Sequence, residues 1–392
     1  MKYLNLFLLF FILFLPLCSD DFTDVIPEES TEITETIAIY PLNFYHPFAG
    51  TAENPYLISS LNNLRWLSET REAWGSEYQS IYYRQTADID ASETINWNNG
   101  EGFRPIGQVS SFIHDYFYGE YDGGNFVIDG LFINPHRNIV YQESVGFFAG
   151  ILNSRLLNIR LENISIAAQF DIGAITALAF NSSILNCSVS GVIQADENTF
   201  AVGTLIGRAD STLIEFCSST AMIFGKNNED GYSVIGGLIG SMSESDLRNS
   251  YFNGIIRRQA INSGGLVGFV ANNSHIEFCY ITTKEPLPRD NISLMIGEND
   301  SFPMNFGAIS SSVVNGSSVN NTFFDKQATG VRKGIYLEIK RKFFNKSIRG
   351  LRTSQMKRMS IFRRKGWDFE DVWTIDRDIN DGFPSLIDFV GN

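Results

Sequence analysis

The residues near the C-terminus have the clearest pattern for holding a metal ion. In the segment TIDRDINDGFPSLID, Asp376, Asp378 and Asn380 alternate along the chain. Calcium loops place oxygen ligands at positions 1, 3 and 5 in the same way. However, Gly382 comes one residue later than the glycine of an EF-hand loop. Two interpretations stay open: a calcium site, with calcium as the only cofactor that the sequence suggests, or an ordinary turn at NDGFP.

A second group of candidates consists of carboxylates in the N-terminal part of the chain. Such a group could bind a metal or supply an acid and a base for cleaving a polysaccharide. The alternative is a set of solvated turns, because Asp-Gly pairs are ordinary turn signals. We favour the turns, since only Arg84 and Arg104 lie nearby as basic partners. The carboxylates are Asp88, Asp90, Glu101, Asp115, Glu120, Asp122 and Asp129.

Established catalytic motifs are missing from the sequence. The four His residues form no HExxH, and there is no CxxC, GxSxG or Walker A motif. The stretch GGLIGS at 236–241 resembles a phosphate loop, but variants of it recur along the chain, so strand and turn packing explain it better. No catalytic residue is assigned, and the sequence favours a protein without enzymatic activity.

The first 19 residues have the pattern of a secretory signal peptide. Lys2 is followed by an uninterrupted apolar run at 6–15, which is too short for a transmembrane helix of about 20 residues. Cys18 follows in LPLC, a loose match to a lipoprotein signal, so it is a candidate for lipidation; ordinary cleavage near Ser19 is the alternative. Residues 20–45 carry seven acids and no Lys or Arg, which predicts an acidic flexible tether.

Internal repeats decide the expected fold. From residue 145 to about 330, units with an apolar-Gly strand, a polar turn and a second strand recur every 28–33 residues. The second strands contain the anchor residues Leu156, Ile184, Ile214, Leu247 and Ile276. Short strands without helical periodicity predict the stacked coils of a β-solenoid rather than a propeller, whose blades need about 40–45 residues. Residues 46–144 would form the first coils and a helical cap, with one short helix at about 60–74.

The repeats GGLIG and GGLVG, with VGFFAG and VGTLIG as variants, resemble the GLUG repeat of bacterial surface proteins. GTAENPYLISSLNNLRWLS resembles the family's entry to these repeats, and NTFFDKQATG, GWDFEDVWTID and NDGFPSL resemble its end, so the likeness covers roughly residues 48–392. GLUG repeats also occur beside the catalytic domain of some IgA-cleaving metalloproteases. The resemblance implies an all-β protein with a right-handed parallel β-helix, at the surface of a bacterial cell or outside it.

Charge is distributed unevenly. The net charge is -14, which argues against a general nucleic-acid binder. Residues 331–365 nevertheless contain thirteen Lys or Arg and one acid, and they look like a basic insertion before a closing motif at 366–392. This insertion could contact an anionic polymer or lipid, or it could pair with the acidic remainder of the protein.

The cysteines test the repeat register. Cys187, Cys217 and Cys279 each lie three residues after an anchor, and Asn158, Asn186 and Asn249 lie where a bend would need left-handed backbone. We therefore expect the three cysteines to face the core, buried and unpaired. Phe216 and Phe278 replace Asn in two units, so we expect no unbroken Asn ladder.

Taken together, the sequence predicts a secreted or cell-surface, adhesin-like β-helix. It would bind or display glycans or surface proteins, and it would meet a membrane only through a lipid anchor, as in an outer-membrane lipoprotein. The alternative is a polysaccharide lyase or glycoside hydrolase on the same fold.

Overall fold

The anchor strands of successive repeats pair with one another in parallel, as the register requires. Leu156 pairs with Ile184, Ile184 with Ile214, Ile214 with Leu247 and Leu247 with Ile276. The predicted spacing of the coils is therefore confirmed. These strands form sheet 1, in the order β1 (Tyr56–Ile58), β2 (Ile81–Gln85), β6 (Gly119–Asp122), β10 (Arg155–Leu157), β13 (Ser183–Leu185), β16 (Leu213–Glu215), β21 (Asp246–Arg248), β25 (His275–Glu277) and β29 (Ser318–Asn320).

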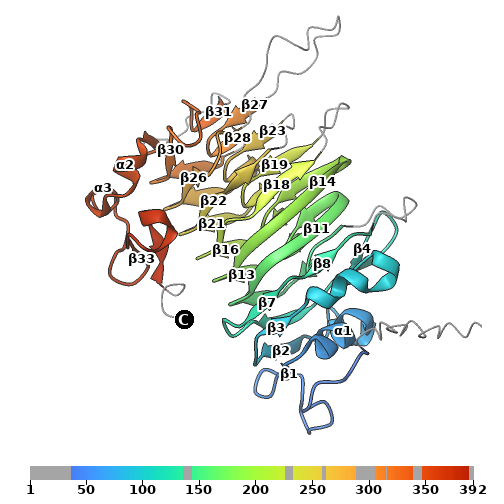
Figure 1. Ribbon diagram of the computed structural model, residues 1–392. Coiled ribbons are helices and arrows are strands. Elements are labelled where there is room, and N and C mark those ends of the chain that lie inside the picture. The colour runs from blue at the N-terminus through green and yellow to red at the C-terminus, as the bar shows by residue number, and fades with distance from the viewer. Residues whose placement is uncertain are drawn as a thin grey trace, which may run out of the picture. The chain divides into compact units, whose positions relative to one another are not determined.

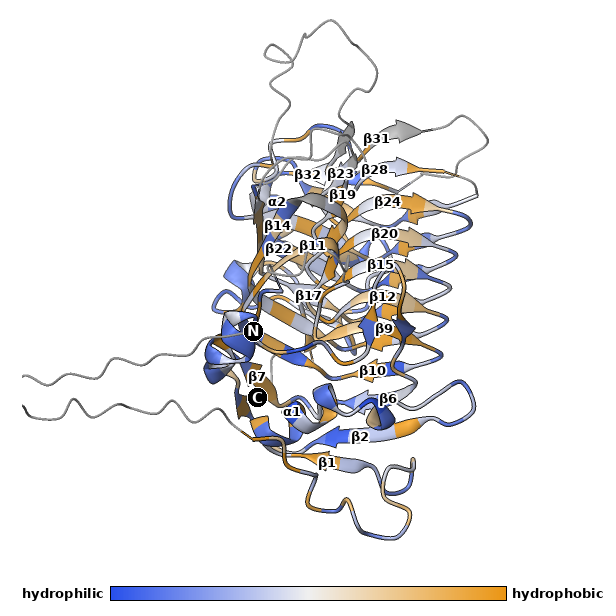
Figure 2. Cartoon of the chain, turned by 90° about the vertical axis from the view of Figure 1, so that its right-hand side faces the viewer, coloured by the Kyte–Doolittle hydropathy of each residue, from blue (hydrophilic) through white to orange (hydrophobic). Residues whose placement is uncertain are grey.

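Two further sheets complete each coil, so the fold is an all-β parallel β-solenoid of about eight turns (Figure 1). Sheet 2 contains β9 (Phe148–Leu152), β12 (Thr176–Phe180), β15 (Ile206–Asp210), β20 (Ile239–Ser243), β24 (Val267–Ala271), β28 (Ser310–Val313) and β31 (Ile335–Glu338). Figure 2 shows these strands one above another. Sheet 3 contains β3 (Ile89–Asp90), β7 (Val127–Asp129), β8 (Phe132–Ile133), β11 (Arg160–Gly173), β14 (Ser188–Gly203), β17 (Ser218–Ser219), β18 (Met222–Gly225), β19 (Val234–Gly236), β22 (Tyr251–Ile256), β23 (Asn262–Gly264), β26 (Tyr280–Thr283), β27 (Asn305–Gly307), β30 (Phe323–Asp325) and β32 (Arg349–Leu351).

This computed structural model describes residues 37–135, 144–225, 233–257, 262–287, 305–314, 316–338 and 347–387, all within the unit Glu35–Asn392. The predicted signal peptide and Cys18 lie outside the described residues. Among the described residues, no helix is long and apolar enough to cross a membrane.

The N-terminal helix forms where its apolar spacing predicts it. Helix α1 (Leu61–Glu69) begins after Ser60, whose hydroxyl accepts a hydrogen bond from the Asn63 backbone at 3.3 Å, and η1 (Arg71–Trp74) follows. Helix α1 buries Leu64 and Leu67 in the same core as the strands. The short 3₁₀ helices η2 (Ser92–Asn96) and η3 (Asn98–Gly100) and the antiparallel pair β4 (Gln108–Val109) and β5 (His114–Asp115) complete the N-terminal part.

The predicted tether 20–45 is too long at its C-terminal end. The Asn63 side chain donates hydrogen bonds to the backbone oxygens of Ile39 (3.0 Å) and Tyr40 (3.1 Å), and the Leu57 backbone donates to the Asn43 side chain (3.0 Å). Residues 37–45 therefore belong to the folded unit, because their backbone is bonded to α1 and the Asn43 side chain is bonded to β1.

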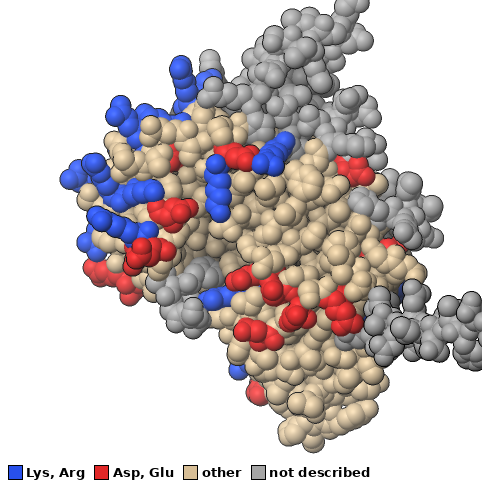
Figure 3. Space-filling view, viewed as in Figure 1, with Lys and Arg blue, Asp and Glu red and all other residues tan. Residues whose placement is uncertain are grey.

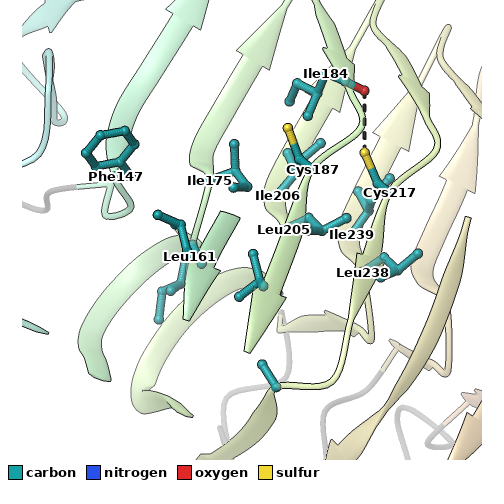
Figure 4. Close-up of a cluster of buried hydrophobic side chains, with 14 of the residues drawn as sticks. Phe147, Leu161, Ile175, Ile184, Cys187, Leu205, Ile206, Cys217, Leu238 and Ile239 are labelled. Atoms are coloured by element: carbon teal, nitrogen blue, oxygen red, sulfur yellow. Dashed lines mark hydrogen bonds between the residues drawn. The ribbon is translucent and has the colours of Figure 1, made fainter. Parts of the chain in front are cut away.

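The core confirms the expected positions of the cysteines and bends. Cys187, Cys217 and Cys279 are fully buried and free. The Cys217 thiol donates to the Ile184 oxygen of the preceding coil, with sulfur and oxygen 3.5 Å apart (Figure 4). Asn158, Asn186 and Asn249 have positive φ angles, and Phe216 and Phe278 have the same conformation (φ 55° and 52°).

Buried hydroxyl groups of successive coils form a ladder that we did not predict. The Thr212 backbone N–H donates to the Ser245 hydroxyl at 3.0 Å, Ser245 N–H to Ser274 at 3.1 Å, and Ser274 N–H to Ser317 at 3.1 Å. Each member lies two residues before an anchor-strand residue that points into the core, so the recurrent Ser or Thr at that position was a usable signal. The ladder supplies partners for backbone groups at a corner where the sheet pattern is interrupted.

The prediction that residues 331–365 form an insertion is wrong for two parts of this segment, which are strands of the solenoid. Strand β31 pairs with β28, and β32 pairs with β30, so both extend the last coil. The sequence offered no apolar-Gly repeat for them. Their assignment to the coil depends on backbone pairing, which tolerates Arg and Lys on the outer face.

The closing segment, residues 353–386, packs on the outside of sheet 3. It contains α2 (Thr353–Met356), α3 (Met359–Arg363), the antiparallel pair β33 (Trp373–Thr374) and β34 (Ser385–Leu386), and η4 (Asn380–Gly382). Its aromatic residues cover a column of outward-facing rings on three successive coils. This second core, separate from the solenoid interior, contains Tyr251, Tyr280, Phe323, Leu351, Met356, Phe362, Trp367, Trp373, Phe383 and Leu386.

Candidate functional site

The N-terminal carboxylates do not converge on one site. Asp122 accepts hydrogen bonds from Asn158 (2.8 Å) and from the Gly124 backbone (2.9 Å), and it lies 3.3 Å from Arg84. Glu120 pairs with Arg155 at 2.8 Å. These carboxylates therefore stabilise turns and join neighbouring coils, which agrees with the turn interpretation.

The remaining carboxylates of this group have similar local partners. Asp88 accepts from the Val127 backbone at 2.8 Å, and Asp90 accepts from the Ser92 backbone at 2.9 Å. Asp129 accepts from the Asn163 side chain at 2.7 Å. Hydrogen bonds from the Ser92 side chain, and then from its backbone N–H, lower the pKa of Asp90. Glu101 contributes through its backbone, whose oxygen accepts a hydrogen bond from the Asn134 N–H at 2.7 Å. Within the described ranges, no group of three or more His, Cys, Asp or Glu residues could hold a metal ion.

The candidate calcium residues lie at the end of the closing segment, and only two of them point to solvent. Asp376 and Asp378 are exposed, and the Asp376 carboxylate accepts from the Asp378 backbone at 2.9 Å, as in a turn. The Asn380 side chain points the other way. Its amide nitrogen donates to the Tyr280 hydroxyl (2.6 Å), and its oxygen accepts from Asn253 (2.8 Å). The structure thus gives Asn380 a structural contact with the solenoid, and calcium binding stays a prediction.

Basic side chains gather over α2 and α3, while acidic side chains are more frequent towards the N-terminal coils (Figure 3). Some of these cations contact aromatic rings: Lys357 Nζ lies 4.7 Å from the Phe383 ring centre, and the Arg363 guanidinium lies 6.0 Å from that of Phe369. Such contacts fix the stems of the side chains and leave their charges near solvent. Contact of this surface with an anionic polymer stays a prediction.

A pocket with a cavity volume of about 230 Å³ lies where η1 and the loop after it meet β5. Sequence reasoning singled out Asp115 but did not connect it with Arg71. The Arg71 guanidinium binds both oxygens of the Asp115 carboxylate, with its Nε 2.7 Å from Oδ2. This ion pair lowers the pKa of Asp115 and raises that of Arg71. Aromatic rings of Trp74, Tyr78 and Tyr118 line the same pocket.

No family model matches the chain. Over 166 residues, or 42% of this chain, the sequence is 32% identical to halomucin from Haloquadratum walsbyi (strain DSM 16790 / HBSQ001). The match spans only 2% of the length of that relative.

Among solved structures, the chain is similar to a Bacteroides ovatus protein described as a candidate immunoglobulin A1 protease. The TM-score is 0.54 at 16% identity, covering 86% of this chain and 94% of that one. A structure named IgA1 Protease matches with a TM-score of 0.45 at 18% identity, covering 75% of this chain and 21% of that one. The first similarity shows the β-helix fold and is compatible with the resemblance of the repeats to the GLUG family.

Proposed function

We propose that this protein is a secreted or cell-surface β-solenoid of the GLUG-repeat type, which binds or displays glycans or surface proteins. The stacked coils support this proposal because they form a long, regular surface in which each coil contacts only its neighbours. Binding by such a surface needs no converging catalytic groups.

The main observation behind this proposal is the use of the carboxylates. An acid/base or metal site would bring two or more unpartnered carboxylates into one cleft. Here Asp122, Glu120 and Asp129 are bonded to side chains of neighbouring coils. The polysaccharide lyase or hydrolase is therefore the less favoured alternative.

A location outside the cytoplasm is part of the proposal. The basic and apolar start of the chain supports it, as does the similarity to halomucin. Intact-mass spectrometry of the native protein tests the processing. A mature chain that begins at or just after Cys18, with or without a lipid, is expected; a cytoplasmic chain that keeps Met1 would contradict the proposal.

Binding and catalysis are separated by two measurements on the same full-length protein. We expect saturable binding on an array of immobilised glycans or to intact cells, and no reducing sugar released from the glycans that bind. Steady release of reducing ends would instead support the enzyme.

Calcium binding by Asp376 and Asp378 is proposed separately. Isothermal titration calorimetry with CaCl₂ tests it, with Asp376→Asn as the variant that should lose binding. Asp371→Asn, an exposed acid of the same segment, is the control. Absence of heat in the unsubstituted protein would contradict the proposal.

A further inference from the structure

We propose that the pocket between η1 and β5 binds a neutral sugar ring through Tyr78 and the Arg71–Asp115 pair. This inference rests on the proposed function and names the class of ligand and the site. The cavity volume, about 230 Å³, is below the ~300–1,000 Å³ of pockets for drug-sized ligands. It therefore suits one small ring better than a long segment of polymer.

The pocket is formed by backbone contacts between two separate stretches of the chain. Tyr118 N–H donates to the Trp74 oxygen at 2.7 Å, and the next residue, Gly75, has φ 75°. A Cβ at Gly75 would lie only 2.4 Å from the Tyr118 oxygen, so the close approach requires glycine here. Ser76 and Gln79 then exchange two backbone hydrogen bonds, which place Tyr78 at the tip of a tight turn. The walls thus exist before any ligand arrives.

The aromatic side chains supply a surface for the apolar face of a ring. Tyr78 lines the pocket and is 90% exposed, so most of its ring is available to a ligand. Tyr118 is half-buried on the opposite stretch of chain. A sugar has one face of C–H groups and a rim of hydroxyls, and tyrosine suits such ligands because its ring is apolar and its hydroxyl is polar.

The ion pair supplies the polar contacts. Asp115 is held as a carboxylate, so it can accept hydrogen bonds from ligand hydroxyls. Arg71 uses its Nε and one Nη2 hydrogen for Asp115, which leaves the other guanidinium N–H groups pointing elsewhere. Neighbouring hydroxyls of a sugar can accept from these remaining N–H groups and donate to the adjacent carboxylate.

The charge of the pocket favours a neutral ligand over an acidic one. The positive charge of Arg71 is matched by Asp115, and Glu77 adds a further negative charge at the rim. His114 also lies in the wall. A carboxylate, sulfate or phosphate on the ligand would meet net negative charge and would be repelled.

The test uses the full-length protein and methyl glycosides of glucose, galactose, mannose and N-acetylglucosamine, with methyl glucuronide as the acidic counterpart. Saturation-transfer NMR should detect at least one neutral glycoside. Tyr78→Ala should weaken that binding about tenfold, and Asp115→Asn should weaken it while the thermal melt stays cooperative. Tyr45→Ala is the matched control, because Tyr45 is also a highly exposed tyrosine (83%) but lies outside the pocket.

The outcomes distinguish this inference from the proposed function. Preference for the glucuronide, or neutral binding that persists in both Tyr78→Ala and Asp115→Asn, overturns the inference. If glycosides and the array bind both variants as well as they bind the unsubstituted protein, the pocket is excluded while a binding function stands. If neither glycosides, the array nor cells bind the unsubstituted protein, both proposals fail.

Discussion

The hydroxyl of Tyr280 accepts a hydrogen bond from the side chain of Asn380, one hundred residues later in the chain, with oxygen and nitrogen 2.6 Å apart. The same hydroxyl donates to the Pro384 oxygen at 2.5 Å. Tyr280 faces outward from coil strand β26, and Asn380 belongs to the closing segment. This contact fixes the segment on the flank of the solenoid, and it makes the NDGFP turn a structural element.

We therefore expect Asn380→Ala to lower the free energy of unfolding by about 1–3 kcal/mol, because Tyr280, Asn253 and Pro384 each lose a partner. Tyr280→Phe should also destabilise, and the double variant should lose less than the sum of the two. Urea denaturation measures all three. Tyr45→Phe, at an exposed position, should stay within about 0.5 kcal/mol of the unsubstituted protein. Strict additivity would show that the Tyr280–Asn380 contact is unimportant in solution.

Removal of residues 331–365 is expected to abolish the single cooperative unfolding transition. The deletion takes β31 from β28 and β32 from β30, and it removes buried Phe362 from the second core. Newly exposed strand edges also favour aggregation. Calorimetry tests this expectation. Arg358→Gln with Arg364→Gln is the control, because both side chains are exposed and their substitution changes charge alone. An unchanged melting transition in the deletion variant would mean that the last coil is dispensable.

Arg208 should matter more than its exposure suggests, because its partner Asp171 is almost completely buried. Burial raises the pKa of Asp171 even though Arg208 opposes the shift. Since the folded state then binds the proton more tightly than the unfolded state, the contribution of this carboxyl to stability falls as pH rises above about 4. Removing Arg208 leaves the charge uncompensated only where Asp171 is ionised.

Arg208→Ala should accordingly cost about 1–3 kcal/mol at pH 7 and clearly less at pH 3. Arg248→Ala is the matched control. Its partner, Asp246, lies on the same strand, and both side chains are substantially exposed (46% and 29%), so we expect a change of about 0.5 kcal/mol or less. Equal losses for Arg208→Ala at the two pH values would refute this account.

The three core thiols should be unreactive in the folded protein. Burial raises the pKa of Cys187 and Cys279, and the thiolate is the reactive form. In a Cys18→Ser variant, a thiol reagent should label Cys187, Cys217 and Cys279 only after denaturation. Because the folded-state pKa exceeds the unfolded one, stability should also fall as pH rises through about 8.5 and above. Rapid labelling at pH 7 without denaturant would show that the core opens readily.

The sequence by itself determined the repeat and therefore the solenoid. A repeated strand, turn and strand can bury its apolar face only against the next copy, so the anchor residues specify the register. This reasoning placed Leu156, Ile184 and Ile214 one above another and predicted three free, buried cysteines, as the structure has them. It also predicted the left-handed bends at Asn158 and Asn186.

Contacts between distant segments were decided only by the tertiary structure. Nothing local indicates that Asn380 points at Tyr280 or that Arg71 reaches Asp115, since each pair depends on which surfaces the folded chain brings together. The Phe residues that interrupt the Asn bends have the same explanation. Phe216 and Phe278 pack against the second core, and the Phe278 ring lies edge-on to Trp367 of the closing segment, so aromatic packing outweighs the preference for Asn at a left-handed residue. Likewise, backbone pairing with the preceding coil brings β32 (Arg349–Leu351), which lies within the basic segment 331–365, into the solenoid.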